Sequence, residues 1–368
     1  MKDKILFYTS FPKPITGQTI VTQKVWDLLY NDPRFVCFKI NTSSSTIVKK
    51  FFTFISNYFL LVKFLILVKP RFVYMVFSSS KLGCVRDFFS IFIISLFSNV
   101  KLISHVHSGN FGLEFLNFPF NLMLKYNLER VTTIIFQGKQ VNFLGSKYDY
   151  KIKYLMNTIS SEFSISDNEF KEVSCLRKKN FENSGKIKLF FLSNFIISKG
   201  YLDLFDSYEL LDIDVFDKFE LHFIGFWFDD RSKSEFLNKV TKSSRSNCIF
   251  VHEGLSDRLD VKKLLVEMDV FIFPTYYPVE SQPLSILESF SLGIPVVSTY
   301  HATIPEMIED GYNGYLFEKR DHNQLLNIMR GLVNYEIIEY LSLNARDSFN
   351  KRFSEKEFES KFIQLLYA

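Results

Sequence analysis

Two glutamates lie eight positions apart in the segment FIFPTYYPVESQPLSILESFSLGIPVVST, residues 271–299. Pro283 favours the first turn of a helix and Gly293 favours the position after its end, so the pattern predicts a short helix over residues 283–292. Glu280 would then lie in the loop before this helix, and Glu288 inside it. The spacing therefore places one carboxylate ahead of the helix and one on it.

The start of this predicted helix can bind an anion. Ser281 or Gln282 suits the N-cap, and the backbone N–H groups around Gln282, Pro283 and Leu284 open toward whatever lies ahead, although proline contributes none. The positive end of the helix dipole lies behind them. A helix that follows a parallel strand starts at the carboxyl edge, where open α/β sheets bind ligands. The alternative is a capped surface helix with two solvated glutamates, a common arrangement.

His105 and His107 end a predicted strand and enter a loop in the segment LISHVHSGNFG. Because side chains alternate along a strand, both histidines would point to one face of the sheet. Metal ligation is conceivable, yet no third ligand lies near in the sequence. A buried histidine with satisfied hydrogen bonds is the alternative for each.

Asp212 and Asp214 form a D-x-D sequence in the segment LLDIDVFDKF. It falls between a predicted helix and the next strand, at the amino edge of the sheet. We therefore interpret these carboxylates as solvated loop residues and expect no metal site there.

The elements that must position these residues alternate regularly. Short apolar runs alternate with longer helical segments, which is typical of parallel sheets built from βαβ units. The pattern predicts an α/β fold with two parallel sheets. The predicted strands cover residues 4–8, 35–40, 72–76, 101–105, 133–136 and 151–155 in the first half, and 187–192, 220–224, 249–252, 270–273 and 295–299 in the second.

Residues 166–186 lose the apolar periodicity and are dense in charge, Asn and Ser, so we place a linker there. The N-terminal domain then covers residues 1–165 and the C-terminal domain residues 187–350. Residues 351–368 would add a last helix that packs back on the domains. Its apolar face comprises Phe358, Phe362, Leu365 and Leu366.

Length and composition set the class of protein. The 368 residues suit two domains, and 47% hydrophobic with 23% charged residues excludes a mainly disordered chain. The four cysteines lie far apart without a C-x-x-C pair and beside apolar residues, so we expect buried free thiols and a reducing cytosol. The first residues lack the long apolar run and cleavage site of a signal peptide, which predicts an intracellular protein.

Charge is unevenly distributed along the chain. Residues 1–165 carry 20 Lys and Arg against 8 Asp and Glu, a net +12, whereas the whole chain carries +4. A basic half can face nucleic acid, an anionic membrane or a phosphorylated substrate. We find no nucleic-acid-binding motif, and most aromatic residues fall in periodic apolar runs that a core would consume, so no nucleic acid partner is expected.

The apolar stretch at residues 51–68 contains Lys63 near its centre. A central lysine costs roughly 3 kcal/mol in a membrane span, so a buried or interfacial helix is predicted instead. Together with a second apolar helix at residues 88–97 and the surrounding lysines and arginines, it suits docking on an anionic inner membrane leaflet.

The segment around the two glutamates resembles the E-x7-E motif of retaining glycosyltransferase family 4. From Glu280 onward, E-x-x-P-L-x-x-L-E-x-x-x-x-G-x-P-V-V is in register. MKDKILFYTSFPKPITGQT resembles the family's first strand and glycine loop, YLMNTI the end of its first domain, and LFFLSNFIISKG the strand, loop and Lys-Gly helix start of its second. The resemblance implies the GT-B fold, two Rossmann-like domains facing across a cleft, with the nucleotide-sugar donor held mainly by the second domain and the acceptor mainly by the first.

The same resemblance implies roles for single residues. Glu288 would bind the donor ribose, Glu280 would contact the transferred sugar, and Lys199 would hold the donor diphosphate. His107 corresponds to a histidine that contacts the transferred sugar. The expected site residues are Glu280, Lys199 and His107 for catalysis, Gly17, Asn194, Lys199, Gln282, Pro283, Leu284 and Glu288 for donor binding, and Ser108, Gly109 and Asn110 on the acceptor side.

The implied reaction needs positive charge at the leaving group. Breaking a glycosyl diphosphate bond builds negative charge on the phosphate while the sugar becomes oxocarbenium-like. Lys199 and the helix amides before Leu284 would stabilise that charge. Because the family generally works without a metal-binding D-x-D, no metal and no cofactor besides the nucleotide-sugar co-substrate is expected. One position departs from the family, since Asn194 stands where many members have an arginine and cannot supply charge.

These observations predict a cytoplasmic enzyme, peripheral on the inner face of the cytoplasmic membrane. It would transfer a sugar to a saccharide or polyprenyl-diphosphate-linked acceptor in bacterial O-antigen, lipopolysaccharide or capsule synthesis. Two alternatives remain. Asn194 is compatible with a non-catalytic sugar-nucleotide-binding partner of the same fold, and a sugar-nucleotide epimerase would act on the donor alone.

Overall fold

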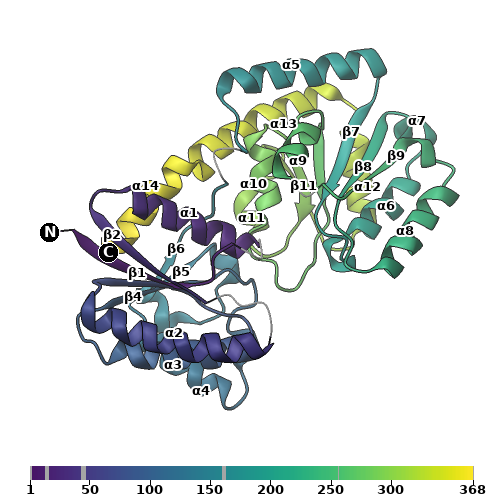
Figure 1. Ribbon diagram of the computed structural model, residues 1–368. Helices are drawn as coiled ribbons and strands as arrows, with labels where there is room; N and C mark the ends of the chain where they lie inside the picture. Colours follow the sequence, from purple (N-terminus) through teal and green to yellow (C-terminus); the bar gives the residue numbers. More distant parts are fainter. Residues whose placement is uncertain (1, 13–15, 43–46, 160–162, 256, 368) are drawn as a thin grey trace. The chain divides into compact units, whose positions relative to one another are not determined.

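The computed structural model describes residues 2–12, 16–42, 47–159, 163–255 and 257–367. The chain forms two compact units, the first comprising Met1–Asn157 with Phe358–Ala368 and the second Thr158–Glu357. Each unit is built on one six-stranded parallel sheet (Figure 1). The predicted α/β class with two Rossmann-like domains is confirmed.

The sheet of the first unit has the strand order β2-β1-β3-β4-β5-β6. All six strands predicted for this half are present, because their apolar runs are buried and helices follow them. Three of them, β3 to β5, have the predicted bounds. The strands are β1 (Asp3–Thr9), β2 (Phe35–Asn41), β3 (Phe72–Val76), β4 (Lys101–His105), β5 (Thr133–Phe136) and β6 (Ile152–Tyr154).

Helices cover both faces of this sheet. Helices α1 and α14 pack on one face, and α2, α3 and α4 lie side by side on the other (Figure 1). The helices of the first unit are α1 (Gly17–Asn31), α2 (Ile47–Leu67), α3 (Lys81–Ser95), α4 (Phe120–Arg130) and α14 (Glu355–Tyr367), with 3-10 helices η1 (Leu113–Phe115), η2 (Lys139–Val141) and η3 (Ser146–Lys151).

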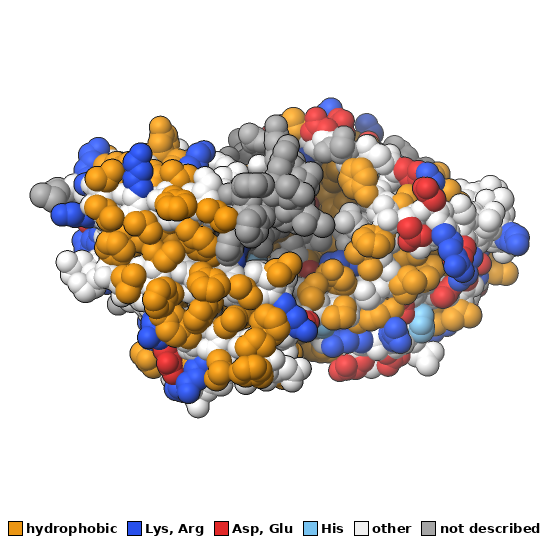
Figure 2. Space-filling model, turned by 60° about the horizontal axis from the view of Figure 1, so that its bottom comes forward, with side chains coloured by type: hydrophobic (Ala, Val, Ile, Leu, Met, Phe, Trp, Pro, Cys, Tyr) orange, Lys and Arg blue, Asp and Glu red, His pale blue; other side chains and the backbone are white. Residues whose placement is uncertain are grey.

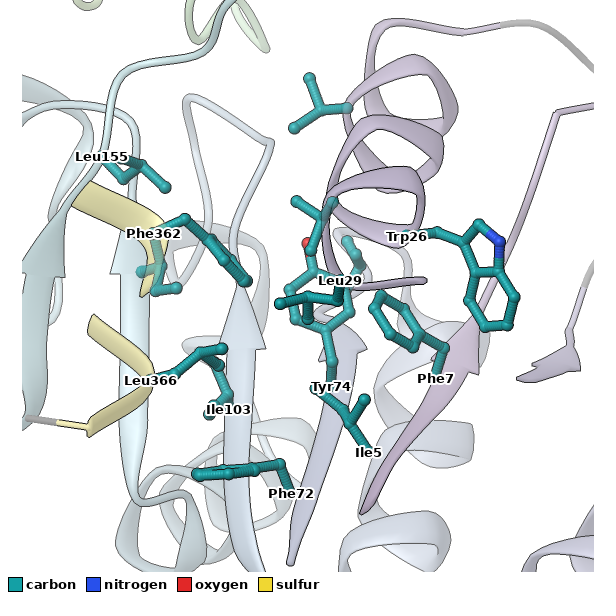
Figure 3. Packing of buried hydrophobic residues seen from close by; sticks show 14 of the residues in the cluster. Ile5, Phe7, Trp26, Leu29, Phe72, Tyr74, Ile103, Leu155, Phe362 and Leu366 are labelled. Atoms are coloured by element: carbon teal, nitrogen blue, oxygen red, sulfur yellow. The ribbon is translucent and has the colours of Figure 1, made fainter. Parts of the chain in front are cut away.

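The core between the sheet, α1 and α14 is rich in aromatic residues (Figure 3). The ring of Phe7 lies 5.2 Å from Trp26 of α1 and 5.2 Å from Tyr74 of β3. Tyr74 in turn meets Phe362 of α14 at 6.1 Å. The C-terminal helix therefore completes the core of the N-terminal unit, as its predicted apolar face requires.

The sheet of the second unit has the strand order β12-β11-β10-β7-β8-β9. Its five predicted strands are present, with β7 and β10 at the predicted bounds. The strands are β7 (Ile187–Leu192), β8 (Phe219–Gly225), β9 (Ile249–Glu253), β10 (Val270–Phe273), β11 (Val296–Thr299) and β12 (Gly314–Phe317).

Strand β12 was not predicted from the sequence. It has four residues and begins with Gly314, so its apolar run is too short to stand out. A Cβ atom on Gly314 would lie 1.9 Å from the backbone oxygen of Val296, so only glycine allows this strand to pair with β11.

Helices also surround the second sheet. Those between strands β7 and β12 are α6 (Tyr201–Glu209), α7 (Ile213–Phe216), α8 (Asp230–Lys242), α9 (Arg258–Leu265), α10 (Leu284–Ser291) and α11 (Ile304–Met307), with 3-10 helices η4 (Ile197–Lys199) and η5 (Ser246–Cys248). After β12 come α12 (His322–Gly331), α13 (Tyr335–Ser348) and the π-helix η6 (Phe349–Phe353).

The prediction of a linker over residues 166–186 is wrong, because this segment forms helix α5 (Asp167–Ser184) in the second unit. Ser166 and Glu169 form a capping box at its start. The first unit accordingly ends at Asn157 rather than at residue 165.

Helix α5 is attached by a few side chains, with Arg177 between two aromatic residues, Phe170 and Phe181, and the Phe181 ring stacks on Tyr335 at 4.2 Å. Arg177 is 4% exposed and donates hydrogen bonds to the backbone oxygens of Val266 and Leu292, at 3.0 and 3.1 Å. Phe170 is buried against Gly293. A polar residue in the middle of the attached side weakens the hydrophobic periodicity of the sequence, so the pattern did not indicate this helix.

Two further predictions concern membranes and thiols. Among the described residues, none of the helices combines the length and the apolarity that crossing a bilayer demands. The four cysteines are free, as their isolated positions predicted, but the prediction that they are buried holds only for Cys84, and Cys175 is exposed.

Candidate functional site

The candidate site of the second unit centres on an ion pair between Lys199 and Glu280. The Nζ atom of Lys199 lies 2.6 Å from Oε2 of Glu280. Both side chains are largely buried, at 13% and 10% exposure. Lys199 follows β7 and Glu280 follows β10, and these two strands are neighbours in the sheet. The pair therefore lies at the carboxyl edge of two adjacent parallel strands, where α/β folds bind ligands.

Gly200 brings the two loops together. Its φ is +87°, and a Cβ atom there would lie 2.3 Å from the backbone oxygen of Pro274. The N–H of Tyr276 donates to the backbone oxygen of Ser198 at 2.8 Å. The loop after β7 is thus joined to the loop after β10 by backbone contact, which fixes Lys199 beside Glu280.

Aromatic rings and a hydroxyl complete the surroundings of the pair. The Nζ atom of Lys199 lies 4.4 Å from the centroid of the Tyr277 ring and 5.5 Å from that of Phe273. The hydroxyl of Thr275 donates to Glu280 at 3.4 Å. An ammonium group held in this way can exchange its carboxylate partner for the oxygens of an anionic ligand.

Helix α10 begins close to Glu280 in the sequence. Its N-cap is Pro283, so the prediction of Ser281 or Gln282 as N-cap is wrong by one or two residues. The backbone oxygen of Ser281 accepts hydrogen bonds from the N–H and hydroxyl of Thr303, at 3.3 and 2.7 Å, which keeps Ser281 in the preceding loop. No side-chain hydrogen bond caps α10 in the described structure. The positive end of its dipole is therefore available to an anion.

Glu288 lies inside α10, as predicted, and is 4% exposed. Its carboxylate forms an ion pair with the guanidinium of Arg258. The guanidinium also lies 5.1 Å from the ring centroid of Phe163. A buried carboxylate that keeps one oxygen for an arginine can present the other to hydroxyl groups.

Arg258 was missed by the sequence reasoning. It is the first residue of α9, the helix that follows β9. The carboxyl ends of parallel strands share one edge of a sheet, so the first residue of each following helix is a candidate ligand-binding residue. This rule could have indicated Arg258. Lys199, Arg258, Glu280 and Glu288 all lie at this edge.

Asn194 lies in the loop after β7 and is exposed. Its backbone oxygen accepts from the N–H of Ile196 at 2.8 Å, and the next residue, Phe195, stacks on Trp227 at 3.9 Å. Asn194 thus lies in the same loop after β7 as Lys199, and aromatic stacking holds this loop.

In the first unit, the rings of His105 and His107 lie side by side at the end of β4 as predicted, with their centroids 4.1 Å apart and their planes tilted by 35°. Burial lowers the pKa of His107 to about 3, and burial together with the charge of His107 lowers the pKa of His105 well below its usual value. Nδ1 of His107 lies 2.6 Å from the amide nitrogen of Gln137, and Nδ1 of His105 lies 2.9 Å from the hydroxyl of Tyr74. Both imidazoles are therefore neutral at neutral pH.

The buried Nε2 atoms of both histidines have no hydrogen-bond partner among the described residues. A buried polar atom without a partner is costly, and a ligand hydroxyl at His107 would satisfy it.

The residues after His107 form a hydrogen-bonded turn. The hydroxyl of Ser108 donates to Oδ1 of Asn110 at 2.6 Å, and Nδ2 of Asn110 donates to Glu114 at 2.8 Å. Gly109 between them is buried. The predicted acceptor-side loop thus has a defined conformation.

Gly17 is the first residue of α1. Thr16 caps this helix, with its hydroxyl accepting from the N–H of Thr19 at 3.2 Å. Residues 13–15 of the predicted glycine loop lie outside the described residues. The start of α1 after β1 corresponds to the position where a Rossmann-like domain turns from strand to helix.

The predicted site residues divide between the two units. Lys199 and Glu280 are in direct contact, and Gln282, Pro283, Leu284 and Glu288 follow at the same edge of the second unit. Gly17, His107, Ser108, Gly109 and Asn110 belong to the first unit.

The D-x-D sequence lies at the start of the short helix α7. Oδ2 of Asp212 accepts from Arg330 at 2.9 Å, and both side chains are well exposed. Within the part of the chain that the structure describes, no three His, Cys, Asp or Glu side chains cluster as metal ligands.

Comparisons with known proteins agree with this architecture. Residues 174–352 match the family model of glycosyl transferases group 1. The amylovoran biosynthesis glycosyltransferase AmsK of Erwinia amylovora is 32% identical over 107 residues, 28% of this chain and 26% of AmsK. The UDP-Gal:alpha-D-GlcNAc-diphosphoundecaprenol alpha-1,3-galactosyltransferase of Escherichia coli is 26% identical over 97 residues, 26% of this chain and 24% of that enzyme. The chain spans between about a quarter and about half the length of the curated relatives it matches.

The likeness to solved structures covers the whole chain. The crystal structure of Anabaena HepE in complex with UDP matches with a TM-score of 0.75 at 16% identity, covering 100% of both chains. The shared architecture is that of GT-B glycosyltransferases. Residues 174–352, slightly less than half of the chain, are thus similar to glycosyl transferases group 1, and the chain as a whole has the GT-B fold.

Proposed function

We propose that the protein is a retaining glycosyltransferase that moves a sugar from a nucleotide-diphosphate donor to a saccharide acceptor. The observation that carries the proposal is the largely buried Lys199–Glu280 pair at the carboxyl edge of β7 and β10, close to the start of α10. The group 1 family match and the likeness to HepE, which was crystallised in complex with UDP, support a nucleotide-sugar donor.

The leaving diphosphate needs positive charge, which Lys199 and the first turn of α10 supply. When the diphosphate binds, Lys199 exchanges the carboxylate of Glu280 for phosphate oxygens. Glu280 is then released to accept hydrogen bonds from the hydroxyls of the transferred sugar. Because a lysine and helix amides neutralise the leaving group, the proposal requires no metal.

Glu288 is proposed to accept hydrogen bonds from the donor ribose. Arg258 holds the buried carboxylate from one side through an ion pair. Glu288 would therefore anchor the nucleoside half of the donor and Lys199 its diphosphate half.

His107 is proposed to contact the transferred sugar through Nε2. Burial lowers the pKa of His107 to about 3, so its imidazole is neutral at neutral pH. The neutral ring can form a hydrogen bond with a sugar hydroxyl without placing a positive charge beside the oxocarbenium-like sugar. Ser108, Gly109 and Asn110 follow it in the turn that we assign to the acceptor side.

We further propose a lipid-linked acceptor in bacterial surface polysaccharide synthesis, such as O-antigen or capsule. The name of the Escherichia coli relative states a diphosphoundecaprenol substrate, and that of AmsK states amylovoran biosynthesis. The net +12 of residues 1–165 suits an anionic lipid surface. The enzyme would act on the cytoplasmic face of the membrane.

A thermal-shift panel tests the donor site. UDP, GDP, ADP, dTDP and their sugar conjugates are added with and without magnesium to wild type, Glu288→Ala and the control Glu267→Ala, whose carboxylate pairs with Lys188 on the surface. A ligand at about 100 times its dissociation constant adds roughly 2.7 kcal/mol of stability. We expect one nucleotide to stabilise wild type and the control without magnesium, and to lose its effect in Glu288→Ala.

Three results would contradict the proposal. If no nucleotide stabilises the protein, the assigned donor site is wrong. Donor binding without transfer to any acceptor, with Glu280→Ala equal to wild type, would favour a non-catalytic partner protein, which Asn194 allows. Isomerisation of the nucleotide sugar in the absence of acceptor would favour an epimerase.

A further inference from the structure

The first unit carries an apolar face that neither its core nor the candidate site uses. Of the 31 large hydrophobic side chains that are exposed in the described part of the chain, thirteen lie between Ile55 and Leu122. Figure 2 shows apolar side chains gathered over the part of the first unit that contains α2, α3 and α4. Monomeric proteins rarely expose contiguous patches beyond a few hundred Å² without a partner.

Helix α3 shows how regular this face is. Leu82, Phe89 and Leu96 are exposed at seven-residue spacing, in and just after the helix, and Leu82 is 85% exposed. Seven residues are about two helical turns, so the three side chains form one outward stripe. The opposite side of α3, with Ile91 and Ile94, is buried. A helix that is apolar on both sides is typical of an element with a partner on each side.

The neighbouring helices extend the stripe into a face. On α2, Phe59 and Ile66 are also seven residues apart, and Phe59 is 74% exposed. On the other side of α3, Phe118 and Leu122 are exposed at the start of α4, with Phe118 at 78%. Helices α2 and α3 are joined by a hydrogen bond from the hydroxyl of Tyr58, and α3 and α4 by ring contacts of Tyr126. The apolar side chains thus span three adjacent helices.

The charges on this face are mostly positive. Between residues 47 and 113 the sequence contains a single acidic residue, Asp87, which is 1% exposed and paired with Arg86. The exposed lysines include Lys63 on α2, Lys81 on α3 and Lys125 on α4. Such a face complements a surface that is anionic outside and apolar beneath.

The cations lie among the apolar side chains. Lys81 lies 5.6 Å from the ring centroid of Phe120, and Arg130 lies 3.5 Å from that of Tyr126. Two acidic residues lie on or beside the face, and both have partners. Glu129, seven residues after Leu122 on α4, pairs with Lys147, and Glu114 accepts from Asn110. A protein partner would be expected to meet charges of both signs, whereas a lipid surface needs only positive ones.

We propose that the outward face of α2, α3 and α4, with the exposed residues around Phe118, docks on an anionic lipid bilayer. Phe59, Leu82, Leu96 and Phe118 enter the headgroup region, and Lys63, Lys81 and Lys125 contact lipid phosphates. The inference extends the proposed function, on which its biological sense rests, by naming the surface that would bring the first unit to a lipid-linked acceptor. Vesicle binding needs no sugar donor, so either proposal can fail without the other.

The test is vesicle flotation of the full chain. Vesicles of phosphatidylcholine alone and of phosphatidylcholine with phosphatidylglycerol are mixed with wild type, with Leu82→Ser/Leu96→Ser, and with the control Ile213→Ser/Phe228→Ser, which changes two equally exposed apolar residues of the second unit. We expect wild type and the control to float with the anionic vesicles. The Leu82/Leu96 variant should lose at least about tenfold in binding, since each buried CH₂ group contributes roughly 0.8 kcal/mol.

Charge-reversal variants test the contribution of the lysines separately from that of the apolar side chains. Lys63→Glu/Lys125→Glu should weaken binding to anionic vesicles and leave the weak binding to phosphatidylcholine unchanged. Added salt should weaken the binding of wild type more than that of this variant, because exposed charges are screened.

Parallel measurements decide between explanations. Thermal melts should show equal folding of all variants, and nucleotide-induced stabilisation should be unchanged in Leu82→Ser/Leu96→Ser. The proposal is overturned if wild type floats with neither vesicle, or if this variant floats like wild type. It is also overturned if light scattering shows a wild-type dimer that this variant converts to a monomer without vesicle binding, because the face would then be a contact between two copies of the chain.

Discussion

The ammonium of Lys199 and the carboxylate of Glu280 lie 2.6 Å apart although the two residues are 81 positions apart in the sequence. The reason is the strand order of the second sheet, in which β10 pairs with β7 while β8 and β9 extend on the other side of β7. The loops after β7 and β10 therefore meet at one edge. Lys199 is thereby fixed beside Glu280 at the candidate site.

Lys199→Ala should lower turnover by roughly 10² to 10³, the scale for losing one preorganised group that stabilises transition-state charge. Steady-state kinetics with the donor named by the thermal-shift panel would measure it. Lys188→Ala is the matched control, since that lysine is on strand β7 itself but pairs with Glu267 at the surface. Activity of Lys199→Ala within about threefold of wild type would refute the role of the lysine in leaving-group stabilisation.

Gly200→Ala should destabilise the second unit by roughly 3 kcal/mol, at the upper end for single substitutions. The new Cβ would meet the backbone oxygen of Pro274 at 2.3 Å, and a φ of +87° disfavours alanine. Gly185→Ala is the control, because it has a φ of +65° but nothing within 4 Å of its Cβ position. It should cost only about 1 kcal/mol for the left-handed backbone. Equal midpoints of the two variants in urea unfolding would show that the close approach of the two loops is not tight.

Arg258→Ala should lower the free energy of unfolding by about 1 to 3 kcal/mol, because the buried carboxylate of Glu288 loses its ion-pair partner. The double variant Arg258→Ala/Glu288→Ala should recover part of this loss, giving a coupling energy of about 1 kcal/mol in a double-mutant cycle. Lys263→Ala, on the same helix, breaks an exposed pair with Asp260 and should change stability by less than about 0.5 kcal/mol. Strictly additive effects at Arg258 and Glu288 would mean that the pair contributes nothing.

The protein should lose stability as the pH falls below about 6.5, the ordinary pKa of histidine. Burial lowers the pKa of His107 to about 3, so between these two pH values the unfolded chain binds a proton that the folded chain does not. Stability therefore decreases with falling pH, by up to about 1.4 kcal/mol per pH unit for each such histidine. His105 acts in the same direction.

This pH dependence can be measured by urea unfolding between pH 7 and pH 4. Trp227→Phe leaves Trp26 as the single tryptophan, which lies in the core of the first unit and reports on its unfolding. In that background His107→Gln should give a shallower dependence on pH than the parent. Parallel curves for the two proteins would show that folding does not lower the pKa of His107.

Much of the fold could be predicted because the strands are short runs of buried apolar residues between helical segments. Eleven of the twelve strands follow this pattern, and β12 does not because it is short and starts with glycine. Helix α5 was not predicted for a different reason. Its attached side has few apolar residues, and Arg177, between Phe170 and Phe181, is held by hydrogen bonds to backbone carbonyls. Hydrophobic patterns indicate elements that are buried by apolar contact and miss those held by polar anchors.

Some features of the candidate site could likewise be predicted from the sequence, and others could not. The spacing of Glu280, Pro283 and Glu288 placed one glutamate before a helix and one within it, because helix boundaries depend on local residue types. The partner of each carboxylate, Lys199 for one and Arg258 for the other, depends on which strands are neighbours.

The sequence by itself determined the local features: the alternation of strands and helices, the two carboxylates around the start of α10, the shared face of His105 and His107, and the basic first half. Each of these follows from residue types over a few turns or strand positions. Only the tertiary structure decided that β10 lies beside β7, that α14 completes the first unit, and that the exposed apolar residues of three helices form one face. Those relationships depend on sheet order and helix packing, which bring together residues that no local pattern connects.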